Sequence, residues 1–325
     1  MKRFAFVLTV TIAGYCTFAQ VAQPLPFHKW QATLKIIDET WQPIAGANVQ
    51  VSYMLPPPPV TPTWGHYGEY GDKIEGLTDT NGIFIASHED QTPSLGITVE
   101  KVGYYKTLRG YEMGVPEHYT LEKWNPSLTV VLKKIGKPIA MYAKWINQNP
   151  PALDQPVGYD LMIGDWVSAS HKGINTDIIF RKEAYRESGT DYEYKVKVTF
   201  PKSGDGIQIY TLPELEKGSV LRSPHEAPLN GYQPELNKER SAHPGQPTKN
   251  DDDPNRIYLF RVRTVIDDKG NVVSAHYGKI YGDFMTFTYY LNPTANDRNI
   301  EFDPKQNLIQ IATGFRSIES PVTEP

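Results

Sequence analysis

A turn signature at residues 79–82, Asp-Thr-Asn-Gly, constrains the fold of this chain more than any other feature. Aspartate, asparagine and glycine tolerate the backbone angles of tight turns, and glycine reaches positive φ without steric cost. Apolar residues alternate with polar ones earlier in the chain, at Ala32, Leu34 and Ile36, as in a strand with one buried face. The sequence therefore predicts half-buried β-strands joined by tight turns.

The order of these elements resembles the carboxypeptidase regulatory-like domain, a small transthyretin-like β-sandwich. The resemblance rests on Asp38, Pro43–Val49 and Leu77–Phe84, and we place the domain at residues 31–134. It implies a non-catalytic accessory module, because no sequence matching the zinc carboxypeptidases that carry this domain is present. We expect its strands at Ala32–Asp38, Asn48–Met54, Gly82–Ser87, Ile97–Val102 and Ser127–Lys133.

The length of 325 residues leaves room for a second β-rich unit, which we place at residues 157–315 after a linker at 135–156. A polar tail follows at 316–325. With 25 glycines, 27 prolines and few helical patterns, we expect an all-β chain whose second unit is a larger antiparallel sandwich or barrel. Its expected strands are Tyr159–Met162, Asp177–Arg186, Tyr192–Phe200, Ile257–Ile266, Val272–Ile280 and Phe284–Leu291.

Turn-forming residues at 187–191 and 267–271 predict two hairpins in this second unit. The unit is similar to uncharacterised secreted bacterial proteins that carry a regulatory-like domain in front. That similarity rests on Gly158–Trp166, Gly204–Gln208, Leu221–Pro224, Tyr281–Phe284 and Asn292–Thr294. It implies an architecture and supplies no mechanism.

Residues 1–19 read as a secretory signal peptide: Lys2 and Arg3 precede an apolar stretch and a small-residue cleavage site at Ala19. Cys16 is the only cysteine, and Tyr15 before it argues against a lipoprotein. We therefore expect a secreted or periplasmic protein without disulfides and without a membrane span. The net charge of −4 and the pI near 6.1 argue against a nucleic-acid partner.

Aromatic residues provide the candidate ligand-binding positions. The run Pro56–Pro59 must leave the sheet because proline cannot donate ladder hydrogen bonds, and Trp64, Tyr67 and Tyr70 follow it. Together with Trp166, these rings are candidates for stacking on a sugar. The alternative is that they cover the sandwich surface as ordinary packing.

Carboxylates supply the catalytic and metal alternatives. The candidates for a hydrolase of unknown type are Asp165, His171, Asp205 and Asp283. A calcium site is the only cofactor considered, at Asp251, Asp252, Asp253 and Asn255, within a proline-rich excursion at 213–255. Turn capping and a solvated acidic loop are the structural alternatives for these residues.

These patterns favour a secreted, non-catalytic binding or structural protein of the bacterial envelope or exterior, with carbohydrate as the first ligand class to test. A hydrolase in the second unit, and a scaffold that holds another envelope protein, are the alternatives. The oligomeric state does not follow from the sequence.

Overall fold

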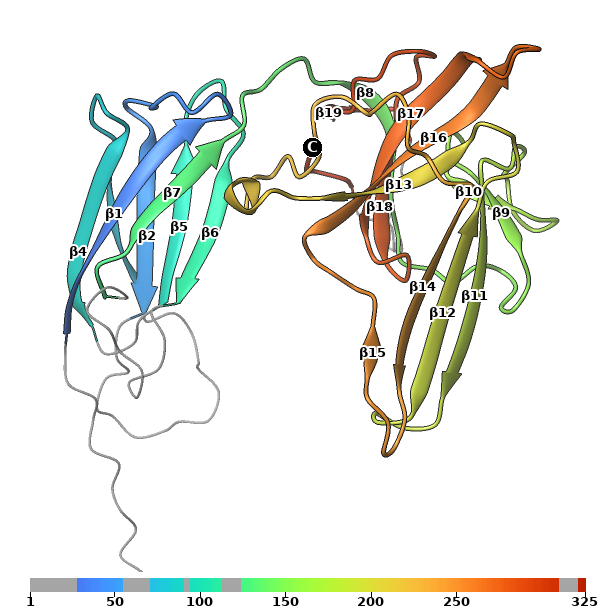
Figure 1. The fold of residues 1–325 in the computed structure, drawn as a ribbon, viewed down its shortest axis with the longest axis horizontal. Helices are drawn as coiled ribbons and strands as arrows, with labels where there is room; N and C mark the ends of the chain where they lie inside the picture. The colour runs from blue at the N-terminus through green and yellow to red at the C-terminus, as the bar shows by residue number, and fades with distance from the viewer. Residues whose placement is uncertain (1–27, 55–70, 91–93, 113–123, 310–320) are drawn as a thin grey trace, which may run out of the picture.

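The computed structural model describes residues 28–54, 71–90, 94–112, 124–309 and 321–325. Its regular elements are β-strands and one short 3₁₀ turn, η2 (Glu214–Glu216), as Figure 1 shows. The expected all-β fold is confirmed. No helix in the described ranges is long and apolar enough to cross a membrane.

The first sandwich comprises the strands up to residue 132. A three-stranded sheet in the order β4-β1-β7 faces a four-stranded sheet in the order β3-β2-β5-β6. Their inward side chains form one core that includes Trp30, Leu34, Val49, Val51 and Ile97. The strands are β1 (His28–Asp38), β2 (Asn48–Met54), β3 (Gly71–Leu77), β4 (Ile83–Asp90), β5 (Ser94–Glu100), β6 (Thr107–Glu112) and β7 (Ser127–Leu132).

The turn at residues 79–82 is present, but it joins β3 to β4, which belong to different sheets. The Asp79 carboxylate accepts the amide hydrogens of Asn81 at 2.9 Å and Ile83 at 2.8 Å. Gly82 has φ +73°, and a Cβ there would lie 2.4 Å from the Ile36 carbonyl oxygen. The turn therefore fixes how the chain crosses from one layer to the other.

The second sandwich comprises two six-stranded sheets. The sequence left a sandwich and a barrel open for this unit, and the structure shows a sandwich. The sheet orders are β10-β9-β11-β12-β14-β15 and β13-β16-β17-β18-β8-β19. Aromatic and aliphatic side chains from both sheets, including Tyr159, Phe180, Val198, Phe260 and Tyr289, form the core between them. Its first six strands are β8 (Ile139–Ile146), β9 (Val157–Asp160), β10 (Asp165–Val167), β11 (Ile178–Arg186), β12 (Tyr192–Thr199) and β13 (Gly206–Thr211).

The remaining strands include three that the sequence did not predict: β14 and β15 lie in the excursion at 213–255, and β19 follows the last expected strand. The remaining strands are β14 (Glu235–Ala242), β15 (Lys249–Asn250), β16 (Arg256–Ile266), β17 (Val272–Gly282), β18 (Phe287–Leu291) and β19 (Phe302–Asn307). The predicted hairpins are confirmed, since β11 pairs with β12 and β16 pairs with β17, both antiparallel. Within the expected linker, β8 is a strand of the second sandwich, paired with β18.

The segment that follows η2 lies against the first sandwich (Figure 1). The Leu108 amide donates to the Gly218 carbonyl at 2.8 Å, and the Val220 amide donates to the Lys106 carbonyl at 3.0 Å. His225, in the same segment, contacts Glu39 of the first sandwich and Glu301 of the second. Backbone and charged contacts therefore hold the two sandwiches together.

Candidate functional site

Of the aromatic candidates, only Trp166 lies within the described residues, because Trp64, Tyr67 and Tyr70 fall in the undescribed range 55–70. Trp166 is 4% exposed and packs edge-on against Tyr159 and Phe180 in the core of the second sandwich. Its ring therefore presents no face to a ligand, which corrects the expectation. The indole is buried because β10 folds back on β9 and turns it inward.

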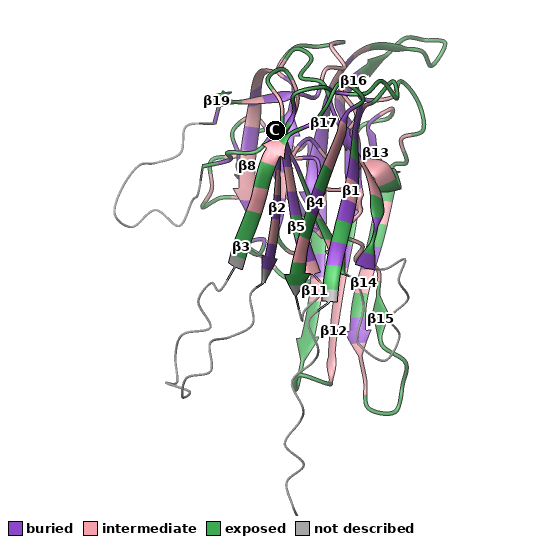
Figure 2. Cartoon of the chain, turned by 90° about the vertical axis from the view of Figure 1, so that its left-hand side faces the viewer, coloured by how far each residue is buried: buried purple, intermediate pink, exposed green. Residues whose placement is uncertain are grey.

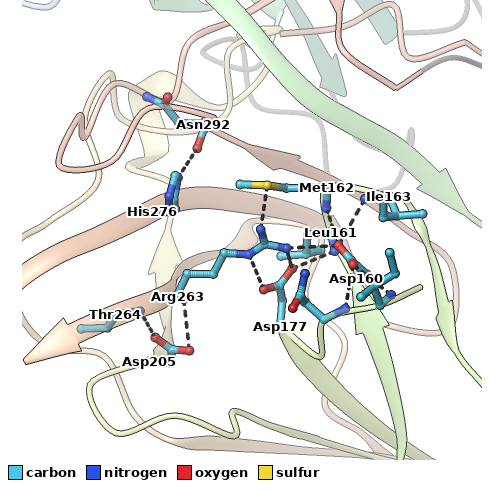
Figure 3. A network of polar contacts seen from close by, with 12 residues as sticks. Asp160, Leu161, Met162, Ile163, Asp177, Asp205, Arg263, Thr264, His276 and Asn292 are labelled. Atoms are coloured by element: carbon cyan, nitrogen blue, oxygen red, sulfur yellow. Dashed lines mark hydrogen bonds and ion pairs between the residues drawn. The ribbon is translucent and has the colours of Figure 1, made fainter. Parts of the chain in front are cut away.

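Asp205 supports a bulge in the backbone of β16, where the register with β17 shifts between Val262 and Val265. The bulge frees two amide groups from the ladder, and the buried Asp205 carboxylate accepts both, from Arg263 at 3.2 Å and Thr264 at 2.8 Å. Burial raises the pKa of Asp205, although these hydrogen bonds oppose that effect. Figure 3 shows the carboxylate facing the bulge, so its role there is structural.

Arg263 then reaches two buried carboxylates of the opposite sheet (Figure 3). Its guanidinium donates to Asp177 at 2.7 and 2.9 Å and to Asp160 at 3.1 Å. Burial raises the pKa of Asp160, but backbone amides and Arg263 outweigh it and lower the pKa overall. One arginine therefore pairs with both buried acids and ties the two sheets together.

The other hydrolase candidates lie in separate segments of the chain. Asp165 accepts the amide hydrogens of Trp166 and Lys172, and Asp283 accepts those of Met285 and Thr286. The His171 Nδ1 lies 2.8 Å from the Ser168 hydroxyl oxygen. In the described ranges no carboxylate lies within ion-pair distance of this ring to orient it.

The calcium candidates are directed to different partners. The carboxylate of Asp251 accepts the Glu239 amide, that of Asp252 pairs with Lys238 at 2.7 Å, and that of Asp253 accepts the Asn255 amide at 2.9 Å. Over the part of the chain that the structure describes, no group of three or more histidine, cysteine, aspartate or glutamate side chains is arranged to hold a metal.

A different surface gathers side chains suited to ligand binding. Strands β11, β12 and β14 extend past the loops of the opposite sheet (Figure 1), and we call residues 182–186, 192–196 and 238–242 the projecting arm. Its inner face is the side that continues from the core residues Phe180 and Val198. Figure 2 shows the ends of β11 and β12 as exposed and partly buried.

Strand register places the residues of the inner face in three rows. Moving away from the core, the rows are Lys182–Val196–Lys238, Ala184–Tyr194–Arg240 and Arg186–Tyr192–Ala242. Because side chains alternate along a strand, every residue in these rows points to the same side. The row nearest the core is a valine between two lysines, and the two outer rows combine tyrosines with arginines and alanines.

Two tyrosines form the centre of the inner face. The rings of Tyr192 and Tyr194 lie 5.6 Å apart, between centroids, at an interplanar angle of 39°. The Arg240 guanidinium carbon lies 5.9 Å from the Tyr192 ring centroid. The small residues Ala184 and Ala242 flank the tyrosines on their neighbouring strands.

Two lysines lie at the base of the arm. Lys182 is 2% exposed, and its ammonium donates to the Met285 carbonyl at 3.4 Å. Burial lowers its pKa to about 8, with opposition from the charge of Asp283. Lys238 is paired with Asp252 and lies 5.6 Å from the Tyr258 ring centroid.

The outer face of the same strands has a different character. Its charged side chains pair with one another, as in Arg181–Glu183 and Lys197–Glu235, both at 2.8 Å. Tyr185, on this face, is 49% exposed and donates to Glu187. The outer face is a solvated surface of ion pairs, whereas the inner face combines rings with cations.

Sequence reasoning missed the inner face for a definable reason. Tyr192 and Tyr194 alternate with polar residues in phase with Val196 and Val198, which is the pattern of a core face. Arg240 lies in β14, whose sequence Glu-Leu-Asn-Lys-Glu-Arg-Ser-Ala has almost no apolar residues. The alternation located the strand, but nothing in it indicated that the opposite sheet ends before the tyrosines.

Comparison with known proteins adds little. No protein-family model matches the chain, and no curated protein sequence does. Among solved structures, 3-chlorocatechol 1,2-dioxygenase from Rhodococcus opacus aligns at 15% identity and a TM-score of 0.24, covering 33% of this chain and 60% of that one. A streptococcal ancillary pilin aligns at 13% identity and a TM-score of 0.22, covering 78% of this chain and 59% of that one.

A DUF3823 family protein from Parabacteroides merdae aligns over 85% of this chain and 98% of its own length, at 7% identity and a TM-score of 0.20. This chain spans about three fifths of the dioxygenase and of the pilin. With TM-scores this low, none of these similarities supports a statement about what the chain binds or does.

Proposed function

We propose that the chain is a secreted, non-catalytic binding protein of the cell envelope or exterior, and that it binds a polysaccharide on the inner face of the projecting arm. The observation that carries this proposal is the tyrosine pair Tyr192–Tyr194 on a sheet face that the opposite sheet leaves uncovered. Large aromatic side chains at such positions commonly mark a binding surface.

The chemistry of the pair suits a sugar chain. The faces of aromatic rings carry partial negative charge, and the C–H groups on the flat side of a pyranose carry partial positive charge. Two rings side by side on one strand offer successive contacts to successive sugars. The tyrosine hydroxyls add polar contacts without the entropy cost of long flexible side chains.

Export is supported by the sequence of residues 1–19 alone, which lie outside the described residues. The hydrolase alternative has less support, because Asp160, Asp165, Asp205 and Asp283 are engaged by backbone amides or by Arg263. These carboxylates hold turns and a bulge in place, and none of them faces the tyrosine pair as a free acid.

The test is affinity electrophoresis of the mature chain in gels that contain neutral or acidic polysaccharides. Wild-type protein should be retarded by at least one polymer, and the double variant Tyr192→Ala/Tyr194→Ala should migrate freely. Tyr185→Ala is the matched control, because this tyrosine lies on the outer face of the same arm. It should be retarded like the wild type.

A Tyr192→Phe/Tyr194→Phe variant separates stacking from folding, because it keeps both rings. It should retain most of the retardation, and circular dichroism should show that all variants are folded. Free migration of the wild type in every gel, or full retardation of the folded alanine double variant, would contradict the proposal.

A further inference from the structure

The inner face of the projecting arm carries an excess of positive charge. Lys182, Lys238, Arg186 and Arg240 all occupy its rows, in register with the tyrosines or one row away from them. The nearby carboxylates are Asp252, which pairs with Lys238 at 2.7 Å, and Asp283, whose carboxylate accepts two amides of its own loop. Four cations thus face two acids.

Three of these cations form no ion pair among the residues that the structure describes. Within the described ranges, no aspartate or glutamate oxygen lies within 4.0 Å of the charged nitrogens of Lys182, Arg186 or Arg240. On the outer face of the same strands, by contrast, Arg181, Lys195 and Lys197 each pair with a glutamate. Among the described residues, the same strands therefore carry paired cations on the outer face and mostly unpaired cations on the inner face.

The arrangement of these groups matches the chemistry of an acidic sugar. Arg240 contacts the Tyr192 ring, and Arg186 lies opposite Tyr192 on the neighbouring strand. A guanidinium binds a carboxylate through two parallel hydrogen bonds, which makes arginine suited to recognising that group. A carboxylate on a sugar stacked over the tyrosines would therefore lie within reach of both arginines.

We propose that the ligand of this face is an acidic polysaccharide whose sugar carboxylates pair with Arg186 and Arg240 while its rings stack on Tyr192 and Tyr194. This inference rests on the proposed function and adds the charge of the ligand to it. The desolvated ammonium of Lys182, at the inner end of the face, adds to the positive potential there.

The experiment compares two oligosaccharides by isothermal titration calorimetry: a hexagalacturonate and the same hexamer after reduction of its carboxyl groups to alcohols. Wild-type protein should bind the acidic hexamer at least about tenfold more tightly, as expected for charge-assisted hydrogen bonds. Raising the salt concentration should weaken binding of the acidic hexamer and leave the reduced one almost unchanged.

Substitutions test which residues cause the difference in affinity between the two hexamers. Arg186→Gln/Arg240→Gln should lose the preference for the acidic hexamer and retain binding of the reduced one, whereas Arg181→Gln on the outer face should behave as wild type. Single-stranded DNA with the same number of charges serves as a polyanion control and should bind more weakly than the hexagalacturonate.

The outcomes separate this inference from the proposed function. Equal affinity for the two hexamers, or an unchanged preference in the folded arginine double variant, would overturn the acidic ligand and leave polysaccharide binding standing. Equal binding of DNA and hexagalacturonate would also overturn it, because the face would then recognise any polyanion. No binding of either hexamer or of any other polysaccharide would remove the proposed function itself.

Discussion

The imidazole of His225 is hydrogen-bonded through Nδ1 to the carboxylate of Glu301, a side chain that is only 3% exposed. Its Nε2 lies 3.2 Å from a carboxylate oxygen of Glu39 in the first sandwich. One histidine therefore connects an acid of each sandwich. Tyr105 donates a further hydrogen bond to Glu301 at 2.8 Å, so this contact is part of a polar junction between the two.

The first prediction concerns the pH dependence of stability at this junction. Hydrogen bonds to Glu301 and then to Glu39 raise the pKa of His225 from 6.5 to about 9 in the folded protein. A histidine with a raised folded pKa contributes stability that is fully present below its unfolded pKa and is lost as pH rises through the folded value. The melting temperature should therefore fall between pH 6.5 and 9, and this fall should be smaller in His225→Gln.

Differential scanning fluorimetry from pH 6 to 10 measures this effect, with His171→Gln as the control because that ring lies in a partly exposed loop and forms no ion pair among the described residues. Parallel pH profiles for wild type and His225→Gln would show that the junction does not titrate in this window.

The second prediction concerns the tie between the two sheets of the second sandwich. Arg263→Gln leaves Asp160 and Asp177 buried without their shared counter-charge, and breaking a buried ion pair from one side costs about 3–5 kcal/mol. Urea unfolding should show this loss in the free energy of unfolding. Arg256→Gln, which removes an exposed pair with Asp253, should leave the urea midpoint almost unchanged.

The third prediction tests the turn between the layers of the first sandwich. Gly82→Ala places a Cβ 2.4 Å from the Ile36 carbonyl oxygen at a residue with φ +73°. It should destabilise the protein by about 1–3 kcal/mol. Gly110→Ala is the control, because a Cβ there meets no atom within 4 Å and its φ is not positive. Equal urea midpoints for the two variants would refute the role given to Gly82.

The fourth prediction links stability to ligand binding. Burial lowers the pKa of Lys182 to about 8, so its charged form opposes folding, and this penalty disappears as pH rises from 8 towards the unfolded value of 10.5. Lys182→Met should therefore raise the free energy of unfolding at pH 7 by about 1–3 kcal/mol. The gain should shrink at pH 10.

The same variant should bind hexagalacturonate more weakly, because it removes one positive charge from the inner face. Such a gain in stability with a loss of binding is typical of a residue kept for function. A less stable Lys182→Met, or one with unchanged affinity, would show that Lys182 serves packing.

Much of the strand content could be predicted from the alternation of apolar and polar residues along the sequence. Strands such as β1 and β12 have apolar residues that repeat with period two, and burial on one face dictates that repeat. Among the strands that were missed, β3 and β14 are rich in charged residues, and their hydrogen bonds come from pairing with β2 and β12. Their partners lie far away in sequence, so no local pattern identified them.

The candidate site, like the strands, could be predicted from the sequence only in part. The sequence located Tyr192 and Tyr194 on one strand but selected Trp166 as the ligand-binding ring, and that ring is buried. Whether an aromatic side chain lies in the core or on a surface depends on where the opposing layer ends. The position of that edge is a property of the packed sandwich.

By itself, the sequence determined the all-β class, most strands and the turn at Gly82, because strand periodicity and turn geometry are local consequences of side-chain burial and allowed φ angles. Only the tertiary structure decided that Arg240 meets Tyr192, that Arg263 pairs with Asp160 and Asp177, and that β11, β12 and β14 project beyond their partner sheet. These relationships depend on the register between distant strands and on the packing of two layers.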